Sequence, residues 1–143
     1  MAITQAMATS FKVQLLNGQQ NFSANVFKLA LYTSSATLGE NTTVYSATNE
    51  VPSTGNYSAG GNTLTVSVTP TNSGNVAYIS FSNTSWANAT ITANGALIYN
   101  ANLSNAAVAV LAFGGDKTST NGTFAVNFPT ADATNAIIRL TAS

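Results

Sequence analysis

The sequence predicts a mainly β protein, an antiparallel β-sandwich or barrel of about eight strands with one α-helix at the N-terminus. Three observations lead to this fold class. After Asn21, apolar and polar residues alternate with a period of two over many short segments, as in half-buried strands. Turn-forming Gly, Pro and Asn residues separate these segments at intervals of roughly 8–15 residues. A helical period of 3.6 residues occurs only at the start of the chain.

The predicted helix runs from about residue 4 to residue 16. Four apolar residues recur every four positions and so share one helical face: Ile3, Met7, Phe11 and Leu15. We call these four residues the apolar stripe. Thr4 offers an N-cap side chain, and Asn17–Gly18 offers the left-handed residue that ends many helices. A lone amphipathic helix must bury its apolar face, so the stripe is expected to dock on the sheet or to form the interface with a neighbouring subunit.

In the first half of the chain, strands are predicted at residues 26–32, 42–46, 63–69 and 76–81. The alternation is clearest where Leu64, Val66 and Val68 point inward and Thr or Ser points outward. Residues 48–62 carry one Pro and several Gly, which predicts a long loop.

In the second half, strands are predicted at residues 90–93, 96–99, 106–113, 124–128 and 136–140. Asn94–Gly95 predicts a two-residue hairpin turn, because both turn positions need positive φ. The apolar run 106–113 predicts a central strand buried on both faces, which Gly114–Gly115 ends. No internal repeat or change of composition divides the chain, so residues 1–143 are expected to form one domain.

The composition excludes several classes of function. Only 6% of the residues are charged and the net charge is zero, against about 25% charged residues in typical domains. Without a basic patch, the chain is not expected to bind nucleic acid or an anionic membrane. The chain has no His and no Cys, so the commonest general base, thiol nucleophile and metal ligands are missing. We therefore predict no enzyme, no cofactor and no metal site.

Membrane insertion and export are not expected either. The first residues lack a basic leader and a continuous apolar run of the signal-peptide type. No segment approaches the roughly 18 consecutive apolar residues that a membrane-spanning helix needs. The sequence is thus expected to fold in the cytoplasm in which it is made.

The side chains that remain for catalysis are few. Four carboxylates, predicted to be solvated loop charges and turn formers, are Glu40, Glu50, Asp116 and Asp132. Spatial pairing of two of them, as in a glycosidase, is the less favoured alternative. Three lysines could activate a Ser only outside any known motif: Lys12, Lys28 and Lys117.

Two glycine pairs and one loop suggest ligands only weakly. Gly60–Gly61 and Gly114–Gly115 are predicted to be turns between strands, since a phosphate loop needs a following helix. Asp116 and Asn121, with backbone carbonyls, are a weaker alternative as calcium ligands.

Two aromatic residues are candidates for a binding surface. Trp86 lies in a polar stretch and Tyr57 in the loop rich in Gly, so either ring could stack on a sugar. The favoured interpretation of Trp86 is structural, with the indole filling one end of the sandwich.

A surface of Thr, Asn, Ser and Ala with few charges suits extensive packing in an assembly. Copies of such a protein repel one another weakly, and their contacts should depend little on salt. Short side chains also lose little entropy on ordering. These properties favour a role in protein–protein contact.

Several segments resemble a family of small virion proteins of tailed bacteriophages, over most of the chain: MAITQAMATSFKVQLLNG, ALYTSSATLG, YSAGG, GALIYN and AVLAFGGDK. The resemblance implies a particle component assembled in the bacterial cytoplasm. The favoured role is a capsid decoration (cement) protein, a homo-oligomer, commonly a trimer, on the major capsid protein. The alternatives are a tail component (tube, tip or fibre-associated subunit) that docks on a neighbouring tail protein, and a host-glycan-binding module that uses Trp86 and Tyr57.

Overall fold

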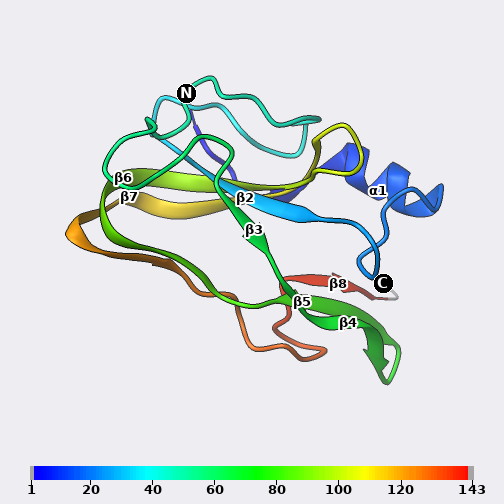
Figure 1. Ribbon diagram of the computed structural model, residues 1–143. Helices are drawn as coiled ribbons and strands as arrows, with labels where there is room; N and C mark the ends of the chain where they lie inside the picture. The colour runs from blue at the N-terminus through cyan, green and yellow to red at the C-terminus, as the bar shows by residue number, and fades with distance from the viewer. Residues whose placement is uncertain (1, 142–143) are drawn as a thin grey trace.

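The computed structural model describes residues 2–141. Its elements in chain order are β1 (Ala6–Met7), α1 (Thr9–Leu16), β2 (Phe27–Tyr32), β3 (Asn62–Leu64), β4 (Val66–Ser73), β5 (Val76–Phe81), β6 (Thr84–Asn100), β7 (Ala106–Val126) and β8 (Ile138–Leu140). They form a five-stranded sheet of order β1-β7-β6-β2-β3 and a three-stranded sheet of order β4-β5-β8, both antiparallel (Figure 1). The mainly β, sandwich-like fold class with a helix near the N-terminus is confirmed.

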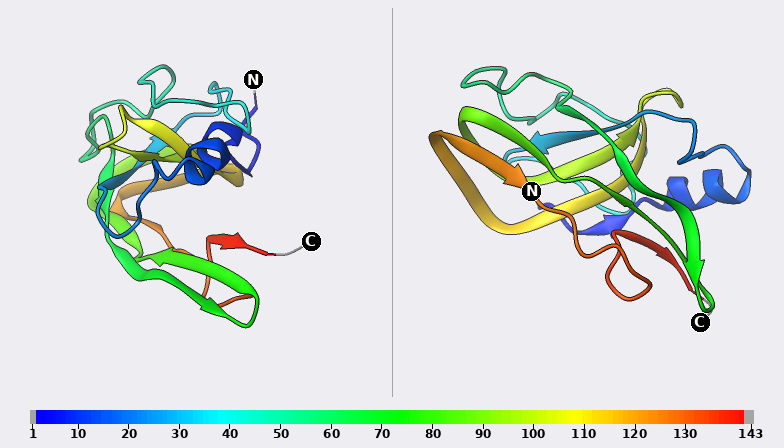
Figure 2. Two further views of the ribbon diagram at one scale, coloured as in Figure 1. Left: turned by 90° about the vertical axis from the view of Figure 1, so that its right-hand side faces the viewer. Right: turned by 60° about the horizontal axis from the view of Figure 1, so that its bottom comes forward.

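The two longest strands, β6 and β7, pair with each other along their length and form one ribbon. The part of the ribbon near Asn100 lies in the upper layer of Figure 1, and at the left of that view the ribbon turns down into the lower layer. Asn88 and Asn121, with φ of 50° and 46°, flank the pair Ala89–Gly122, where the register of the ribbon shifts. Asn tolerates this left-handed conformation better than most residues. Figure 2 shows the result edge-on, with the ribbon joining the two layers on one side.

The hydrophobic core lies between the two layers. Phe27 of β2 stacks on Phe22 with ring centroids 4.6 Å apart, and lies 5.9 Å from Phe81 of β5. Because β2 and β5 belong to different sheets, this aromatic contact ties the layers together. Fully buried aliphatic side chains from β2, β6 and β7 join the same core: Leu29, Leu31, Leu97, Ile98, Val108 and Val110.

The predicted helix is too long at its start. Residues before Thr9 are extended: the Thr4 N–H donates to the Leu38 carbonyl over 2.9 Å, and β1 pairs with Ala109 and Val110 of β7. Pairing with the edge of β7 therefore overrides the helical spacing, and Thr4 caps nothing. The predicted end of the helix is confirmed, because Gly18 has a φ of 72°.

The apolar stripe packs against the protein's own core. Phe11 is fully buried, and Ile3, Met7 and Leu15 pack partly buried against the core. The first of the two predicted docking modes, onto the protein's own sheet, is the one observed. The core of the same chain covers Phe11 and part of the other three side chains, so burial of the stripe does not require a neighbour.

The predicted hairpin at Asn94–Gly95 is wrong, because β6 runs straight through both residues. Gly95 is needed for packing rather than for positive φ. A Cβ atom there would lie 2.6 Å from the Leu111 carbonyl oxygen and 2.7 Å from Cγ2 of Ile3. The true turn of this hairpin lies at 101–105, between β6 and β7.

The prediction that Gly114–Gly115 ends a strand is wrong. The two residues form a bulge within β7. Pairing shifts there from Ala93–Lys117 to Gly95–Ala112, so β7 carries extra residues. Gly114 supplies a φ of 77° that other residues seldom adopt. The strand continues beyond the bulge to Val126.

The other strand predictions fare differently. The segments 26–32 and 76–81 are confirmed as β2 and β5, and the long loop before β3 is confirmed too. The segment 63–69 is split between β3 and β4. At 42–46 only a single bridge, from Val44 to Ala106, replaces the predicted strand.

Candidate functional site

The loop of residues 33–61, which joins β2 to β3, is built around one carboxylate. Glu50 is 8% exposed. Its carboxylate accepts hydrogen bonds from the Tyr45 hydroxyl at 2.6 Å, the Tyr57 hydroxyl at 2.5 Å and the Gly60 N–H at 2.7 Å. Hydrogen bonds to a charged acceptor are the stronger ones in proteins. The loop therefore closes around Glu50.

Further tyrosine contacts extend this cluster into the five-stranded sheet. The Tyr99 hydroxyl of β6 donates to the Gly60 carbonyl at 2.7 Å, and its ring stacks on Tyr45 with centroids 4.7 Å apart. The Leu31 N–H of β2 donates to the Tyr57 hydroxyl at 2.9 Å. We call Glu50 with Tyr32, Tyr45, Tyr57 and Tyr99 the tyrosine cluster.

Burial and the charge of Glu50 both act on the acidity of these phenols. Burial, followed by the negative charge of Glu50, raises the pKa of Tyr99 to about 12. Burial is also the first cause of the raised pKa of Tyr32 and Tyr57, with Glu50 next. In these surroundings a phenolate would lie beside a carboxylate in low dielectric, so the tyrosines act as hydrogen-bond donors at neutral pH.

Glu50 is therefore not the solvated loop charge that the sequence predicts. The error has a physical reason: tyrosines before and after it in the same loop supply the donors that make burial of a carboxylate tolerable. Tyr45 and Tyr57 on either side of Glu50 are the signal that could have revealed the cluster.

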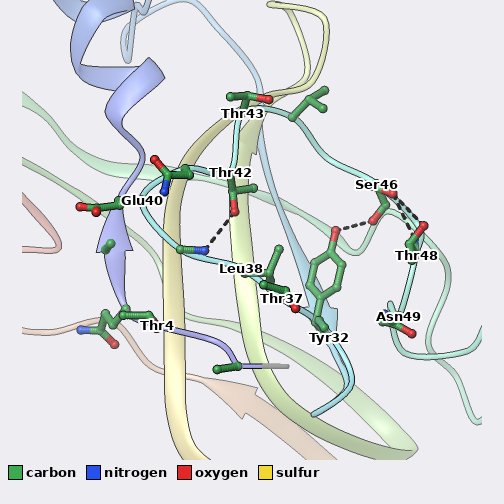
Figure 3. Close-up of a pocket in the computed structure, with 17 residues that line it drawn as sticks. Thr4, Tyr32, Thr37, Leu38, Glu40, Thr42, Thr43, Ser46, Thr48 and Asn49 are labelled. Atoms are coloured by element: carbon green, nitrogen blue, oxygen red, sulfur yellow. Dashed lines mark hydrogen bonds between the residues drawn. The ribbon is translucent and has the colours of Figure 1, made fainter.

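Beside the tyrosine cluster lies a groove of about 1030 Å³ between the N-terminal segment and the first part of the same loop (Figure 3). Its lining is rich in Thr, Ser and Asn, with Tyr32 among the lining residues. The Tyr32 hydroxyl donates to the Ser46 carbonyl at 2.6 Å, and the Gly39 N–H donates to Thr42 Oγ1 at 3.0 Å. Among the described residues of the lining, Glu40 is the single charged one.

The chemistry of this groove is that of hydroxyl and amide groups. Such groups can hydrogen-bond a neutral polar chain, but a hydroxyl without an adjacent base is a weak nucleophile. The lining of this groove therefore offers hydrogen-bond donors and acceptors to a bound molecule.

A second groove, of about 520 Å³, is lined mostly by residues of β7 and of the segment that follows it. Its lining combines Thr118 and Thr123 with apolar side chains. Four of these apolar side chains are partly buried against the core: Leu111, Phe113, Phe128 and Ile137. We call it the β7 groove.

The four carboxylates have separate places and separate partners. Glu40 lines the first groove and Glu50 lies under the loop. Asp116 accepts a bond from Asn94 Nδ2 at 2.9 Å. Asp132 accepts bonds from Thr134 and Asn135, and these donors lower its pKa, Asn135 first.

No group of three acidic side chains forms in residues 2–141. For the calcium alternative, Asp116 bonds Asn94 while the Asn121 N–H donates to Thr90 Oγ1. The Asp116 bond uses a carboxylate oxygen, whereas the Asn121 bond uses the main-chain N–H and not the side-chain oxygen.

The two candidate aromatic residues are interior. Trp86 is 6% and Tyr57 is 2% exposed, with ring centroids 5.6 Å apart. Trp86 also packs edge-on against Phe124 at 6.2 Å. The prediction that either ring stacks on a sugar at the surface is wrong, because each is covered by its neighbours. The structural interpretation of Trp86, a side chain filling the interior, agrees with its burial.

No family model, curated protein or solved structure matches the chain. Within residues 2–141, no helix combines the length and hydropathy that crossing a bilayer would require.

Proposed function

We propose that the chain is a virion structural protein of a tailed bacteriophage, and that it acts as a capsid decoration protein that stabilises the head by protein–protein packing. The segments described above that resemble small phage virion proteins support the first statement. The distribution of charge over the fold supports the second.

One observation carries the proposal. Residues 51–115 contain no Asp, Glu, Lys or Arg, and this stretch includes β3, β4, β5, β6 and the first half of β7. β3 and β4 are also edge strands of their sheets. Edge strands of monomeric proteins usually carry charges that prevent association. An edge without them suits a protein whose edges meet neighbours.

Exposed hydroxyl side chains are frequent from Thr63 to Ser73, the segment that contains most of β3 and all of β4. Every second residue is an exposed Thr or Ser: Thr63, Thr65, Ser67, Thr69, Thr71 and Ser73. Short hydroxyl side chains lose little entropy when a neighbour orders them. Packing of this kind needs no ion pairs, so it resists changes of salt.

The docking element that we propose differs from the apolar stripe that the sequence predicts. The apolar stripe packs on the protein's own core, so the remaining contact surfaces are the strands and the outer side of α1. On that side Leu16 is 89% exposed, and Val13 is exposed too. These residues are the ones that a neighbouring tail or capsid protein could cover.

The abundance of the protein in purified virions tests the proposal. Quantitative mass spectrometry should find a copy number of the same order as that of the major capsid protein. A far lower copy number would support a tail component instead, and absence from the particle would overturn the virion role.

Particles assembled without the protein give a second test. For a decoration protein, heads should assemble normally but release DNA at lower temperature or on dilution. Intact heads without tails would contradict this role and favour the tail alternative.

A further inference from the structure

Three Asn–Gly pairs occur in the chain: Asn17–Gly18, Asn94–Gly95 and Asn121–Gly122. In such a pair the main-chain nitrogen of the glycine can attack the side-chain amide carbon of the asparagine, since glycine carries no Cβ atom that would hinder the approach. Asn is one of the thermally labile residues of proteins. The reaction needs the main chain between the two residues to rotate, so its rate depends on how firmly the fold holds each pair.

The pair Asn94–Gly95 is held in the middle of the five-stranded sheet. Gly95 of β6 is buried and pairs with Tyr32 of β2 on one side and with Ala112 of β7 on the other. The Asn94 side chain is fixed as well, because its Nδ2 donates to the Asp116 carboxylate at 2.9 Å. Rotation of this main chain requires the sheet to open, which costs close to the full free energy of unfolding.

The pair Asn121–Gly122 is anchored to β6. Gly122 pairs with Ala89 of β6, and the Asn121 N–H donates to Thr90 Oγ1 at 3.1 Å. The Asn121 side chain is exposed to solvent. This pair is therefore accessible but still fastened to a strand, so we expect it to react at an intermediate rate.

The pair Asn17–Gly18 lies outside the sheets, at the end of α1 near the right border of Figure 1. Both residues are exposed, and a Cβ atom on Gly18 would meet nothing in residues 2–141 within 4 Å apart from its chain neighbours. The Gly18 N–H donates to the Leu15 carbonyl at 3.2 Å, a bond of the last helical turn. Because α1 has 8 residues and the ends of short helices open at little cost in free energy, this main chain is released more often than that of the other two pairs.

We propose that Asn17 is a site of spontaneous modification, at which the folded protein deamidates while Asn94 stays intact. The Gly18 nitrogen forms a bond to Cγ of Asn17, and the NH2 group of the side chain leaves as ammonia with the proton of that nitrogen. Water then opens the cyclic imide at one of its two carbonyls, which leaves either aspartate or isoaspartate at position 17. Water is the only other reactant.

The product changes the charge of an exposed surface. The protein has a net charge of zero, so one new carboxylate gives it a net negative charge. This carboxylate lies at the C-terminal end of α1, where the helix dipole is already negative, and should weaken the last turn. It also lies beside Leu16, which is 89% exposed. The reaction takes place in this chain alone, so it goes beyond the virion role and is tested without a phage.

Incubation of the folded wild-type chain in mildly alkaline buffer tests the proposal. Anion exchange should separate a growing acidic form, and peptide mapping by mass spectrometry should locate the exchange of NH2 for OH at position 17. Asn17 should react roughly tenfold or more faster than Asn94, with Asn121 between them. Equal rates at Asn17 and Asn94, a faster reaction at Asn121 than at Asn17, or no acidic form at all would overturn the proposal.

The same incubation in concentrated urea shows whether the fold sets these rates. Once the chain is unfolded, Asn94 and Asn121 lose their strand partners, so all three pairs should react at similar rates. A preference for Asn17 that persists in urea would contradict the structural origin of the difference.

Two variants separate position 17 from the other asparagines. Asn17→Gln should abolish the early acidic form, because a glutamine side chain would have to close a larger ring. The matched control is Asn127→Gln, at an exposed residue that is followed by Phe128 instead of Gly, and it should leave the rate unchanged. Circular dichroism confirms that both variants are folded. An acidic form that accumulates at the wild-type rate in Asn17→Gln, or is lost in Asn127→Gln, would contradict the assignment to Asn17.

Discussion

The two halves of β7 both pair with β6 but differ in what surrounds them. Residues Ala106–Val110 are all buried, with β1 on one side and β6 on the other. Beyond the bulge, Phe124 and Val126 are buried, while Thr123 and Ala125 are exposed. The first half has small apolar side chains on both faces, whereas the second alternates. One continuous strand thus lies in the core at its start and at the surface at its end.

The covering of the first half differs as well. The loop of residues 33–61 bonds to its start, where the Ala107 N–H donates to the Thr43 carbonyl at 3.0 Å. The tyrosine cluster holds this loop in place. Breaking the cluster should therefore destabilise the first half of β7. Substitutions in the second half should change the free energy of unfolding only a little.

The largest effect is expected at alkaline pH. An unfolded tyrosine ionises near pH 10, whereas burial and Glu50 raise the pKa of Tyr99 to about 12 and raise that of Tyr32 and Tyr57 as well. Stability from these groups is complete below pH 10 and falls as the pH rises from 10 toward the folded values. Denaturant melts from pH 7 to 12, followed by tyrosinate absorbance, should show ionisation coupled to unfolding. Full ionisation near pH 10 in a folded protein would contradict this.

Removal of the central carboxylate should have the next largest effect. Glu50→Ala leaves the Tyr57 hydroxyl and the Gly60 N–H without their acceptor, which should lower the free energy of unfolding by about 3–5 kcal/mol. The matched control is Glu40→Ala, an exposed residue of the same loop, which should change stability by less than about 0.5 kcal/mol. Urea denaturation measures both, and equal losses would show that the cluster does not hold the loop.

Substitution of two glycines by Ala allows the stability of the two halves of the ribbon to be compared directly. In Gly95→Ala the added Cβ meets the Leu111 carbonyl oxygen, an atom that cannot move without disturbing the sheet, so about 2–3 kcal/mol should be lost. In Gly122→Ala the closest atom is the Thr120 carbonyl oxygen at 3.6 Å, an ordinary contact. That change should be nearly neutral in thermal melts. A larger loss at Gly122 than at Gly95 would reverse the comparison.

Segments with a strict two-residue alternation could be predicted from the sequence, and those shaped by distant contacts could not. β2 and β5 carry their pattern locally, and each was found within a residue of its ends. The spacing of Ile3 and Met7 fits a helix and an extended strand equally well. Only the presence of an open edge on β7 decides between these two conformations. The sequence pattern contains no sign of that edge.

The candidate site shows the same division. Asn94–Gly95 has the composition of a hairpin turn, yet Gly95 is there because Ile3 lies against it. Glu50 is recognisable as a loop residue, but its burial depends on tyrosines that the fold brings together from the loop and from β6. The rings of Trp86 and Tyr57 were open to two interpretations because a polar neighbourhood in sequence says little about the neighbourhood in space.

The absence of charge from Val51 to Gly115 has a colloidal consequence. With a net charge of zero and no His, the protein should barely migrate in an electric field from about pH 5 to 9, and ion-exchange resins should not retain it. Hydration of hydroxyl and amide groups is then what keeps copies apart. Sulfate strengthens burial by being excluded from protein surfaces, so the chain should precipitate at unusually low concentrations of that salt.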